Sequence, residues 1–391
     1  RFIVTPSDSA ACKDAEGYTH CATPMRGSTQ FLSTDSLDRH RRKVCSRLMD
    51  CRTARMGGME MRCDHCKART VHYYGCRDRH CPQCQSRASQ QWCERQRRSL
   101  LPVPYFHLVF TVPHALNGWV QVHPEVVYRR LFESVWNTLS QFGHKTKHLQ
   151  GELGMTAVLH TWGQNLSRHV HVHCLIPGGV LTEAGEWHEA KHQYLFPVRA
   201  LSRRFRGRMV SSLRRSVRTG ELHRLTEPQA IDDVLKKVMQ QDWVVYARPC
   251  LNQAETVVDY LARYTHRIAI SNGRLLSQDG GRIMIRYVDY REGGRQKSLQ
   301  LEGAEFVRRF LMHILPKGFM RIRHFGYLSN RTRRRKLTAI RQALQKPPEV
   351  DVEVKNGSES QRSWPCPRCE DGVVHMVRQI PRFRAVGRVT V

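Results

Sequence analysis

The pattern of apolar and polar positions predicts strands and helices intermixed along most of the chain. An apolar run predicts a buried strand at 105–112, and strand-like segments follow at 153–162 and 168–176. Apolar residues at helical spacing predict a helix over 125–141. The other predicted elements are helices at 198–217, 227–240, 254–267, 303–314 and 332–345 and strands at 242–249, 282–290 and 297–302. This order favours an α+β fold with a basic helical C-terminal region.

The chain divides into four regions by composition. Residues 1–35 show no clear periodicity, and most of the cysteines fall within 36–100. The predicted strands and helices fill 101–345, and a polar linker with a last cysteine pair follows at 346–391. We therefore expect an unassigned tail, a small metal-binding domain, a large α+β domain and a C-terminal extension.

The positive net charge of the chain indicates an anionic binding partner. The 391 residues include 64 lysines and arginines against 34 acidic residues, a formal charge of +30. Nucleic acid is the expected partner, because each neutralised phosphate releases a counterion. An anionic membrane surface is the alternative, but the basic residues are spread through the predicted folded segments. We expect no membrane span, because no apolar run approaches 18 residues, and no small-molecule substrate.

Paired cysteines indicate a metal site. Cys63 and Cys66 form one Cys-x-x-Cys pair, and Cys81 and Cys84 form another. Such pairs in a large chain indicate metal binding in a reducing cytoplasm rather than disulfides. We expect these four thiolates to hold one structural Zn²⁺ in a zinc ribbon, with no open coordination position for catalysis.

Other cysteines leave further metal sites open. Cys45, Cys51, Cys76 and His80 lie near the two pairs and are candidates for a second site or for replacing one ligand. The C-terminal pair is Cys366 and Cys369. The cysteine-rich segment also contains many arginines, which we expect to be exposed and suited to phosphate contacts. We expect DNA contacts from Arg77, Arg79 and Arg87.

A row of histidines predicts a second kind of metal site. His169, His171 and His173 alternate along one predicted strand and would project from one face. If the hairpin turn is centred between Asn165 and Leu166, His160 lies opposite His171, about 5 Å away. His160, His171 and His173 then form a three-imidazole site with open positions for a phosphate; His169 is the weaker candidate.

Two tyrosines add a candidate nucleophile. Tyr260 and Tyr264 are four residues apart on the predicted helix 254–267 and share one face. A tyrosine hydroxyl can attack a phosphodiester that a metal polarises. Aromatic packing is the alternative use of such a pair. On the same helix, we expect Arg263 and Arg267 to contact DNA.

The chain resembles the two-tyrosine HUH rolling-circle transposases of bacterial insertion sequences. The resemblance rests on GCRDRHCPQCQ (75–85), LPVPYFHLVFTVPHALN (101–117), LHTWGQNLSRHVHVHCLIPGG (159–179), YLARYTHRIAISNGRL (260–275), EFVRRFLMHILPKGF (305–319) and RIRHFGYLSN (321–330). These stretches cover most of residues 45–345, and their combination is specific.

The resemblance implies an HUH endonuclease core, a central antiparallel sheet flanked by helices, as the catalytic domain at 101–345. The HUH pair falls on His171 and His173 and the tyrosine pair on Tyr260 and Tyr264. The third ligand is His160 if it comes from the neighbouring strand, or His266 if it comes from the tyrosine helix. The resemblance further implies Mg²⁺ or Mn²⁺, a 5′-phosphotyrosine intermediate on single-stranded DNA, and a cytoplasmic protein at the bacterial nucleoid.

Two other functions remain open from the residues. A non-catalytic zinc DNA-binding protein would explain the charge and the cysteines, but not a histidine row combined with paired tyrosines. A plasmid relaxase or replication initiator would use nearly the same chemistry. The N-terminal cysteine-rich segment and the RIRHFGYLSN stretch favour the transposase.

Overall fold

The computed structural model describes residues 37–190, 195–249, 269–345, 364–369 and 371–383. In this part of the chain runs of strands are intermixed with runs of helices, as expected for an α+β fold. No helix among these residues is both long and apolar enough to cross a membrane.

A five-stranded antiparallel sheet forms the centre of the molecule. Its order is β12-β4-β5-β3-β8, and every neighbouring pair runs antiparallel. The strands are β3 (Tyr105–Thr111), β4 (Gly154–Trp162), β5 (Arg168–Pro177), β8 (Val245–Pro249) and β12 (Ile322–Gly326). The expected central antiparallel sheet is therefore present, and four of its strands match predicted ones.

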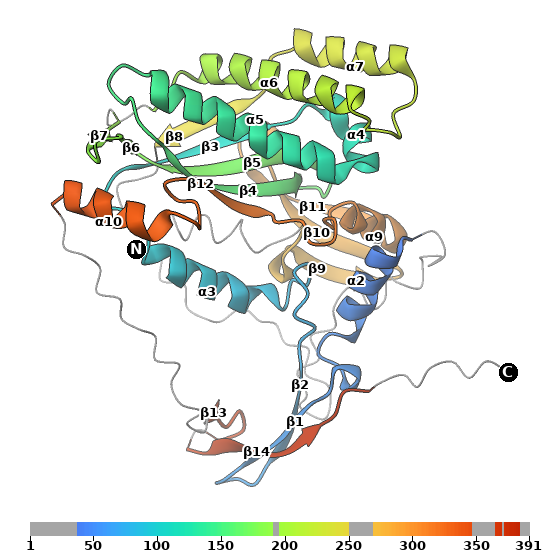
Figure 1. Cartoon of the computed structure of the whole chain (residues 1–391). Coiled ribbons are helices and arrows are strands. Elements are labelled where there is room, and N and C mark those ends of the chain that lie inside the picture. Colours follow the sequence, from blue (N-terminus) through green and yellow to red (C-terminus); the bar gives the residue numbers. More distant parts are fainter. Residues whose placement is uncertain (1–36, 191–194, 250–268, 346–363, 370, 384–391) are drawn as a thin grey trace.

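Helices cover one face of this sheet (Figure 1). They are α4 (Asn117–Val122), α5 (Pro124–Lys145), α6 (Val198–Arg218) and α7 (Pro228–Gln240). Alternate residues of β5, from Val170 to Ile176, face the helices and are buried in the main hydrophobic core. The intervening residues of β5, which include the histidine row, therefore point to the opposite face.

A second layer lies across that opposite face. It contains β9 (Leu275–Asp279), β10 (Arg282–Asp289) and β11 (Arg295–Glu302), which form a separate antiparallel sheet, together with α2 (Arg39–Asp50) and α9 (Gly303–Leu311). The predicted turn between β10 and β11 is confirmed: Gly293 and Gly294 adopt φ values of 69° and 82°, which glycine tolerates. These elements share a core of their own around Phe306, Phe310 and Leu48.

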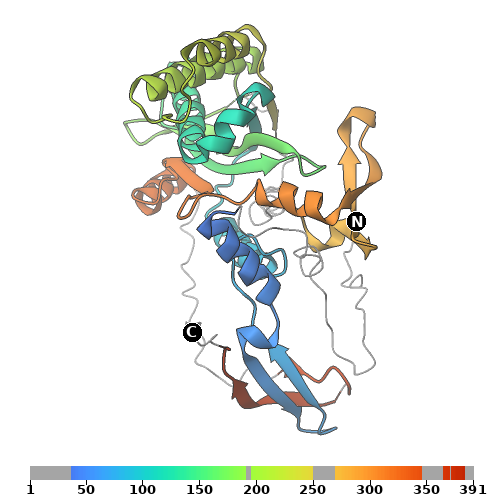
Figure 2. The ribbon, with the colours of Figure 1, turned by 90° about the vertical axis from the view of Figure 1, so that its right-hand side faces the viewer.

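The remaining elements that the structure describes are a projecting sheet, two helices, a short hairpin and four 3₁₀ turns. The projecting sheet has the order β13-β14-β1-β2 and lies away from the other layers in both views (Figures 1 and 2). Its strands are β1 (Gly58–Cys63), β2 (Arg69–Tyr73), β13 (Trp364–Pro365) and β14 (Val373–Ile380). The other elements are α3 (Gln85–Arg97), α10 (Arg333–Ala343), the hairpin of β6 (Gly179–Leu181) and β7 (Trp187–Glu189), and the 3₁₀ turns η3 (Ala54–Met56), η4 (His114–Leu116), η5 (Asn272–Arg274) and η6 (Tyr290–Glu292).

The projecting sheet changes the expected division of the chain. The C-terminal strands β13 and β14 pair with β1 from the N-terminal region, so 364–383 joins the cysteine-rich domain rather than forming an independent extension. The predicted helix 254–267 lies outside the described residues. The edge strand β12 was not predicted, because its alternating polar residues lack an apolar run.

Candidate active site and cysteine clusters

Three buried histidines converge on the face of the central sheet opposite the helices. His160 comes from β4, and His171 and His173 come from β5. Their candidate ligand nitrogens all lie within 4.8 Å of one another. The ring centroids are 5.2 Å apart for His160 and His171, and 4.3 Å apart for His160 and His173. Three side chains this close can share one ion.

The hairpin register explains why these rings meet. His160 pairs directly with His171 across the β4–β5 hairpin, as the placement of the turn predicted. Val158 pairs with His173, two residues further along the ladder. His169 does not belong to the group: its ring packs 5.6 Å from that of His114, nearer the turn.

Hydrogen bonds orient two of the rings. His171 Nδ1 lies 2.9 Å from the carbonyl oxygen of His169, so this nitrogen carries the proton and donates it. The lone pair of His171 is therefore on Nε2, the atom left for a metal. His173 Nδ1 lies 2.9 Å from His107 Nε2. When His173 donates in this bond, its Nε2 also presents a lone pair.

His107 was missed by sequence reasoning. It lies on β3, is buried, and stacks on His173 with ring centroids 5.2 Å apart. The signal was present, since His107 is an ionisable side chain in a mostly apolar strand and lies on the same strand face as Val109 and Thr111. That pattern does not tell which strand pairs with β3.

Burial keeps these imidazoles neutral. Loss of hydration lowers the pKa of His171 to about 3 and that of His107 to about 4. The same cause, with the neighbouring His160 and His171, holds the pKa of His173 well below its usual value. Neutral imidazole is the form that binds a metal, so His171 and His173 are ready to act as ligands near neutral pH.

The predicted nucleophiles Tyr260 and Tyr264 lie outside the described residues, as do Arg263, His266 and Arg267. The structure describes the residues up to 249 and those from 269 onward. Before the gap, Pro249 pairs with Phe106, the neighbour of His107. After the gap, Ala269 and Ile270 are buried in one core with Leu166, which lies in the β4–β5 turn. Both flanks therefore lie beside strands of the histidine site.

Eight of the cysteines that the structure describes form two clusters, and the expected grouping of Cys63, Cys66, Cys81 and Cys84 around one ion is corrected. The first cysteine cluster is Cys51, Cys76, Cys81 and Cys84; the second cysteine cluster is Cys63, Cys66, Cys366 and Cys369. Each Cys-x-x-Cys pair keeps its two thiols together, but the two pairs belong to different clusters. Cys45 belongs to neither cluster and is buried in α2.

The first cysteine cluster has the dimensions of a zinc tetrahedron. The Sγ atoms of Cys51 and Cys84 are 3.6 Å apart, those of Cys51 and Cys81 3.6 Å, and those of Cys76 and Cys84 3.8 Å. A zinc ion with four sulfur ligands at about 2.3 Å requires sulfurs about 3.8 Å apart. The thiols also lie far beyond the disulfide distance of about 2.05 Å. This geometry supports a structural zinc.

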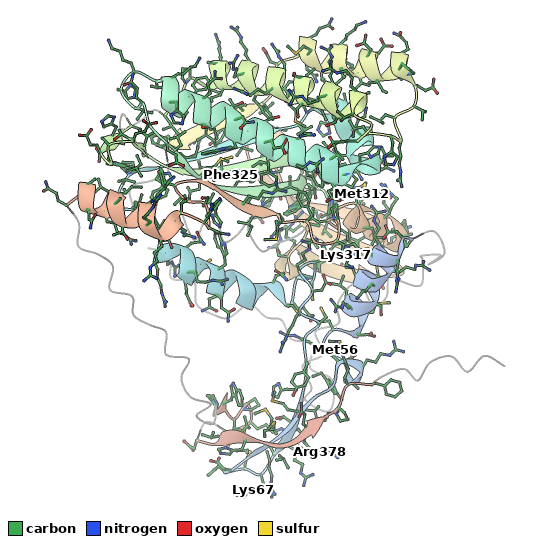
Figure 3. All side chains as sticks on the ribbon, viewed as in Figure 1. Met56, Lys67, Met312, Lys317, Phe325 and Arg378 are labelled. Atoms are coloured by element: carbon green, nitrogen blue, oxygen red, sulfur yellow. The ribbon has the colours of Figure 1, made fainter. Side chains whose placement is uncertain are left out.

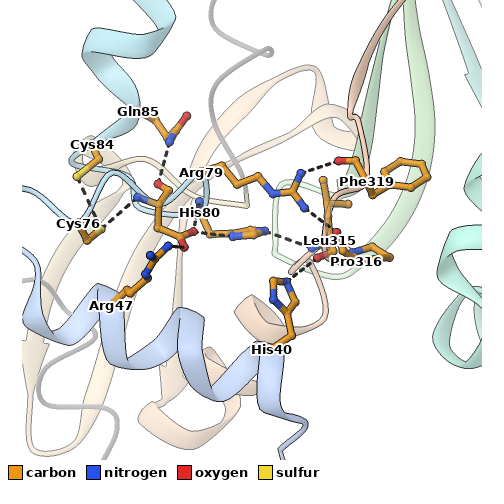
Figure 4. A network of polar contacts seen from close by, with 11 residues as sticks. His40, Arg47, Cys76, Arg79, His80, Cys84, Gln85, Leu315, Pro316 and Phe319 are labelled. Atoms are coloured by element: carbon orange, nitrogen blue, oxygen red, sulfur yellow. Dashed lines mark hydrogen bonds and ion pairs between the residues drawn. The ribbon is translucent and has the colours of Figure 1, made fainter.

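His80 connects the turn of the first cysteine cluster to Leu315, in the segment between α9 and β12 (Figure 4). Its Nδ1 lies 2.8 Å from the Asp78 carboxylate, and its Nε2 accepts the backbone N–H of Leu315 at 3.2 Å. His40 on α2 contacts the carbonyl oxygen of the same Leu315 at 3.0 Å. His80 is thus a structural contact, buried between two parts of the fold.

The arginines expected to bind DNA divide by exposure. Arg79 donates to the carbonyl oxygens of Phe319 and Pro316 at 2.6 and 2.7 Å, so its guanidinium is used inside the protein (Figure 4). Arg77 is exposed. The side chain of Arg87 lies outside the described atoms. Among these three arginines, Arg77 is the one whose described position suits a phosphate contact.

Two segments of the chain match known protein families. Residues 154–336 match the family described as "Putative transposase", and residues 24–112 match the family described as "Transposase zinc-binding domain". The first match contains the three histidines of the site, and the second contains the whole first cysteine cluster. No solved structure matches the chain.

Two relatives extend over most of the chain. The "Putative transposase y4qJ" of Sinorhizobium fredii is 42% identical over 316 residues, which cover 79% of each protein. The "Transposase for insertion sequence element IS801" of Pseudomonas savastanoi pv. phaseolicola is 29% identical over 319 residues, covering 77% of this chain and 73% of that protein. The zinc-binding segment, the transposase segment and these relatives agree: the chain belongs to the IS91/IS801 family of insertion-sequence transposases.

Proposed function

We propose that this transposase nicks and rejoins single-stranded DNA through 5′-phosphotyrosine intermediates, in transposition of the rolling-circle type. The observation that carries the proposal is the convergence of His160, His171 and His173 beside both flanks of the segment that contains the two tyrosines. A transposase must break and join phosphodiester bonds, and this site offers a place to hold the reacting phosphate.

His160, His171 and His173 would hold one divalent metal ion. Three neutral imidazoles leave the ion its full positive charge, and they supply nitrogen rather than oxygen ligands. Mg²⁺ prefers oxygen ligands and gives up water reluctantly, so Mn²⁺ fits this set better than Mg²⁺. When bound, the ion would polarise the scissile phosphate and stabilise the charge that develops on it.

Tyr260 or Tyr264 would supply the nucleophile. Its oxygen forms the new bond to phosphorus, the bond from phosphorus to O3′ breaks, and the product strand ends in a free 3′-hydroxyl. Tyrosine is mostly protonated at neutral pH, because its usual pKa is about 10. A base must therefore accept its proton; the depressed pKa values of His171 and His173 make those rings poor acceptors.

The test is cleavage of a single-stranded oligonucleotide that carries an end of the insertion element, in the presence of Mn²⁺. A covalent protein–DNA adduct on a denaturing gel is the expected product. Replacing both tyrosines by Phe should abolish the adduct, and His171→Ala or His173→Ala should abolish cleavage while DNA binding persists. His169→Ala is the matched control, since His169 neighbours the site but lies outside the group, and it should still cleave.

Two results would overturn the proposal. An adduct formed by the double Tyr→Phe protein would show that other residues are the nucleophiles. Cleavage that survives exhaustive chelation with EDTA would remove the metal from the reaction.

A further inference from the structure

The second cysteine cluster brings together residues from the two ends of the chain. Cys63 ends β1 and Cys66 lies in the turn that follows it, while Cys366 and Cys369 lie in the turn between β13 and β14. The Cys63 and Cys369 Sγ atoms, 306 positions apart in sequence, are 3.7 Å apart. Cys66 and Cys366 Sγ, 300 positions apart, are also 3.7 Å apart. These separations match the roughly 3.8 Å between sulfurs of a four-thiolate zinc site.

Each cysteine pair lies in a closed turn of the kind that presents two thiolates to one ion. The backbone N–H of Cys63 donates to the carbonyl oxygen of Ala68 at 2.9 Å. In the C-terminal turn, the N–H of Cys366 donates to the carbonyl oxygen of Gly372 at 2.7 Å. The two turns are therefore similar in construction and face each other.

The two turns are also bonded directly to each other. The backbone N–H of Asp64 donates to the carbonyl oxygen of Val373 at 3.0 Å. In return, the N–H of Val373 donates to the Asp64 carboxylate at 2.8 Å. The strands behind them continue this pairing, because β1 and β14 run antiparallel from Cys63 opposite Val374 to Gly58 opposite Ile380.

Glycines make room for this close approach. A Cβ atom at Gly372 would lie 2.3 Å from Cys63 Sγ and 2.8 Å from Cys369 Sγ. Gly57 has a φ of 67°, and a Cβ there would lie 2.7 Å from the carbonyl oxygen of Ile380. Both positions exclude a side chain for the same reason: the C-terminal segment packs against the N-terminal one.

The projecting sheet has too small a core to hold itself together. Its buried cluster contains Met61, Cys63, Cys366 and Val374, and two of these are themselves cysteines of the second cysteine cluster. Domains with so little apolar burial usually depend on a metal or on disulfides, and a four-thiolate zinc site supplies folding free energy directly. The sulfurs here are too far apart for disulfides.

We propose that Cys63, Cys66, Cys366 and Cys369 bind a second structural zinc, which closes one domain from both ends of the chain. The matched zinc-binding segment, residues 24–112, and the matched transposase segment, 154–336, both leave out Cys366 and Cys369. The zinc-binding domain thus extends to the C-terminal strands. The zinc holds the basic residues Lys67 and Arg378 at the outer end of the molecule (Figure 3).

The test is the zinc content of the full-length protein and of paired cysteine variants, measured by plasma mass spectrometry after gel filtration. In a His171→Ala background, which keeps the histidine site from adding a zinc ion to the count, the protein should contain two zinc ions per chain. Cys366→Ser with Cys369→Ser should leave one, and Cys63→Ser with Cys66→Ser should also leave one. Combining all four should still leave one, because both pairs serve the same ion. Cys76→Ser with Cys81→Ser should remove the other ion.

Other results contradict the proposal. In the same background, one zinc with all cysteines present, or two zinc ions retained without Cys366 and Cys369, would overturn it, and so would iron in place of zinc. If Cys63 and Cys66 instead shared an ion with Cys81 and Cys84, loss of the C-terminal pair would leave the zinc content unchanged.

Two glycine substitutions, one a test and one its control, probe the second cysteine cluster without removing a thiol. Gly372→Ala should lower the zinc content toward one per chain, because its methyl group would overlap Cys63 Sγ and Cys369 Sγ. Gly207→Ala is the matched control, since a Cβ at Gly207 meets nothing within 4 Å, and it should keep two zinc ions. If Gly372→Ala bound two zinc ions with unchanged affinity, Gly372 would not pack against Cys63 and Cys369 as closely as the structure has it.

Discussion

His107 and His173 come from adjacent strands, 66 positions apart in sequence, and their rings are joined by a contact of 2.9 Å between Nε2 and Nδ1. The bond leaves Nε2 of His173 directed to the metal site when His173 donates. Partners of this kind orient a ligand ring and select its tautomer. His107 is thus a positioning residue for the proposed metal.

We expect His107→Ala to weaken metal binding about 10–100-fold, the usual cost of losing such a partner. Cleavage should therefore require more Mn²⁺, while the rate at saturating Mn²⁺ recovers toward that of the wild type. The measurement is a Mn²⁺ titration of oligonucleotide cleavage. His114→Ala serves as the control, because His114 packs against His169 outside the group. A rate that stays low at any Mn²⁺ concentration would show that His107 does more than position His173.

Arg77 and Arg79 should respond oppositely to the same substitution. Arg79→Gln loses two hydrogen bonds to the carbonyl oxygens of Pro316 and Phe319. Its free energy of unfolding should fall by roughly 1–3 kcal/mol, with little change in DNA affinity. Arg77→Gln should keep its stability, since Arg77 is exposed, and should bind DNA more weakly. Urea unfolding and fluorescence anisotropy measure the two effects; weaker DNA binding by Arg79→Gln with unchanged stability would reverse the assignment.

DNA binding should depend steeply on salt, because phosphate neutralisation by a chain of charge +30 supplies most of the affinity. On single strands, the logarithm of the binding constant should fall by about 0.7 per phosphate contacted for each tenfold rise in salt. Arg77→Gln should reduce that slope by about one contact. Binding that hardly changes between low and physiological salt would rule out this electrostatic mode.

Stability should fall as the pH drops below about 6.5, the usual pKa of histidine in an unfolded chain. Burial lowers the pKa of His313 to about 4 and that of His324 to about 4. Between these values the unfolded chain binds more protons than the native chain, so the free energy of unfolding decreases with falling pH. Urea unfolding at pH 7, 6 and 5 measures this decrease.

His313→Gln isolates the contribution of one ring. His313 Nε2–H donates to the carbonyl oxygen of Leu166 at 3.0 Å, and a glutamine amide can also donate. The variant should lose less stability than the wild type between pH 7 and pH 5. An identical decrease in both proteins would mean that the pKa of His313 in the native protein is not lowered from its value in the unfolded chain.

The histidine site was largely determined by the local sequence. Alternation along β5 places His171 and His173 on one face, and a short hairpin turn permits few registers, so the local residue pattern is enough to place His160 opposite His171. Strand and helix boundaries in the same region follow from apolar periodicity, which acts within a few residues of each position.

The tertiary structure decided which distant pieces meet. A Cys-x-x-Cys turn directs two thiols toward one ion, but its spacing carries no information about the second pair. Pairing of β1 with β14 unites Cys63 and Cys66 with Cys366 and Cys369, while α2 and the turn before α3 unite Cys51 and Cys76 with Cys81 and Cys84. His107 reached His173 in the same way, through the pairing of β3 with β5. Such contacts depend on strand order and packing across the whole chain, which no local pattern of residues specifies.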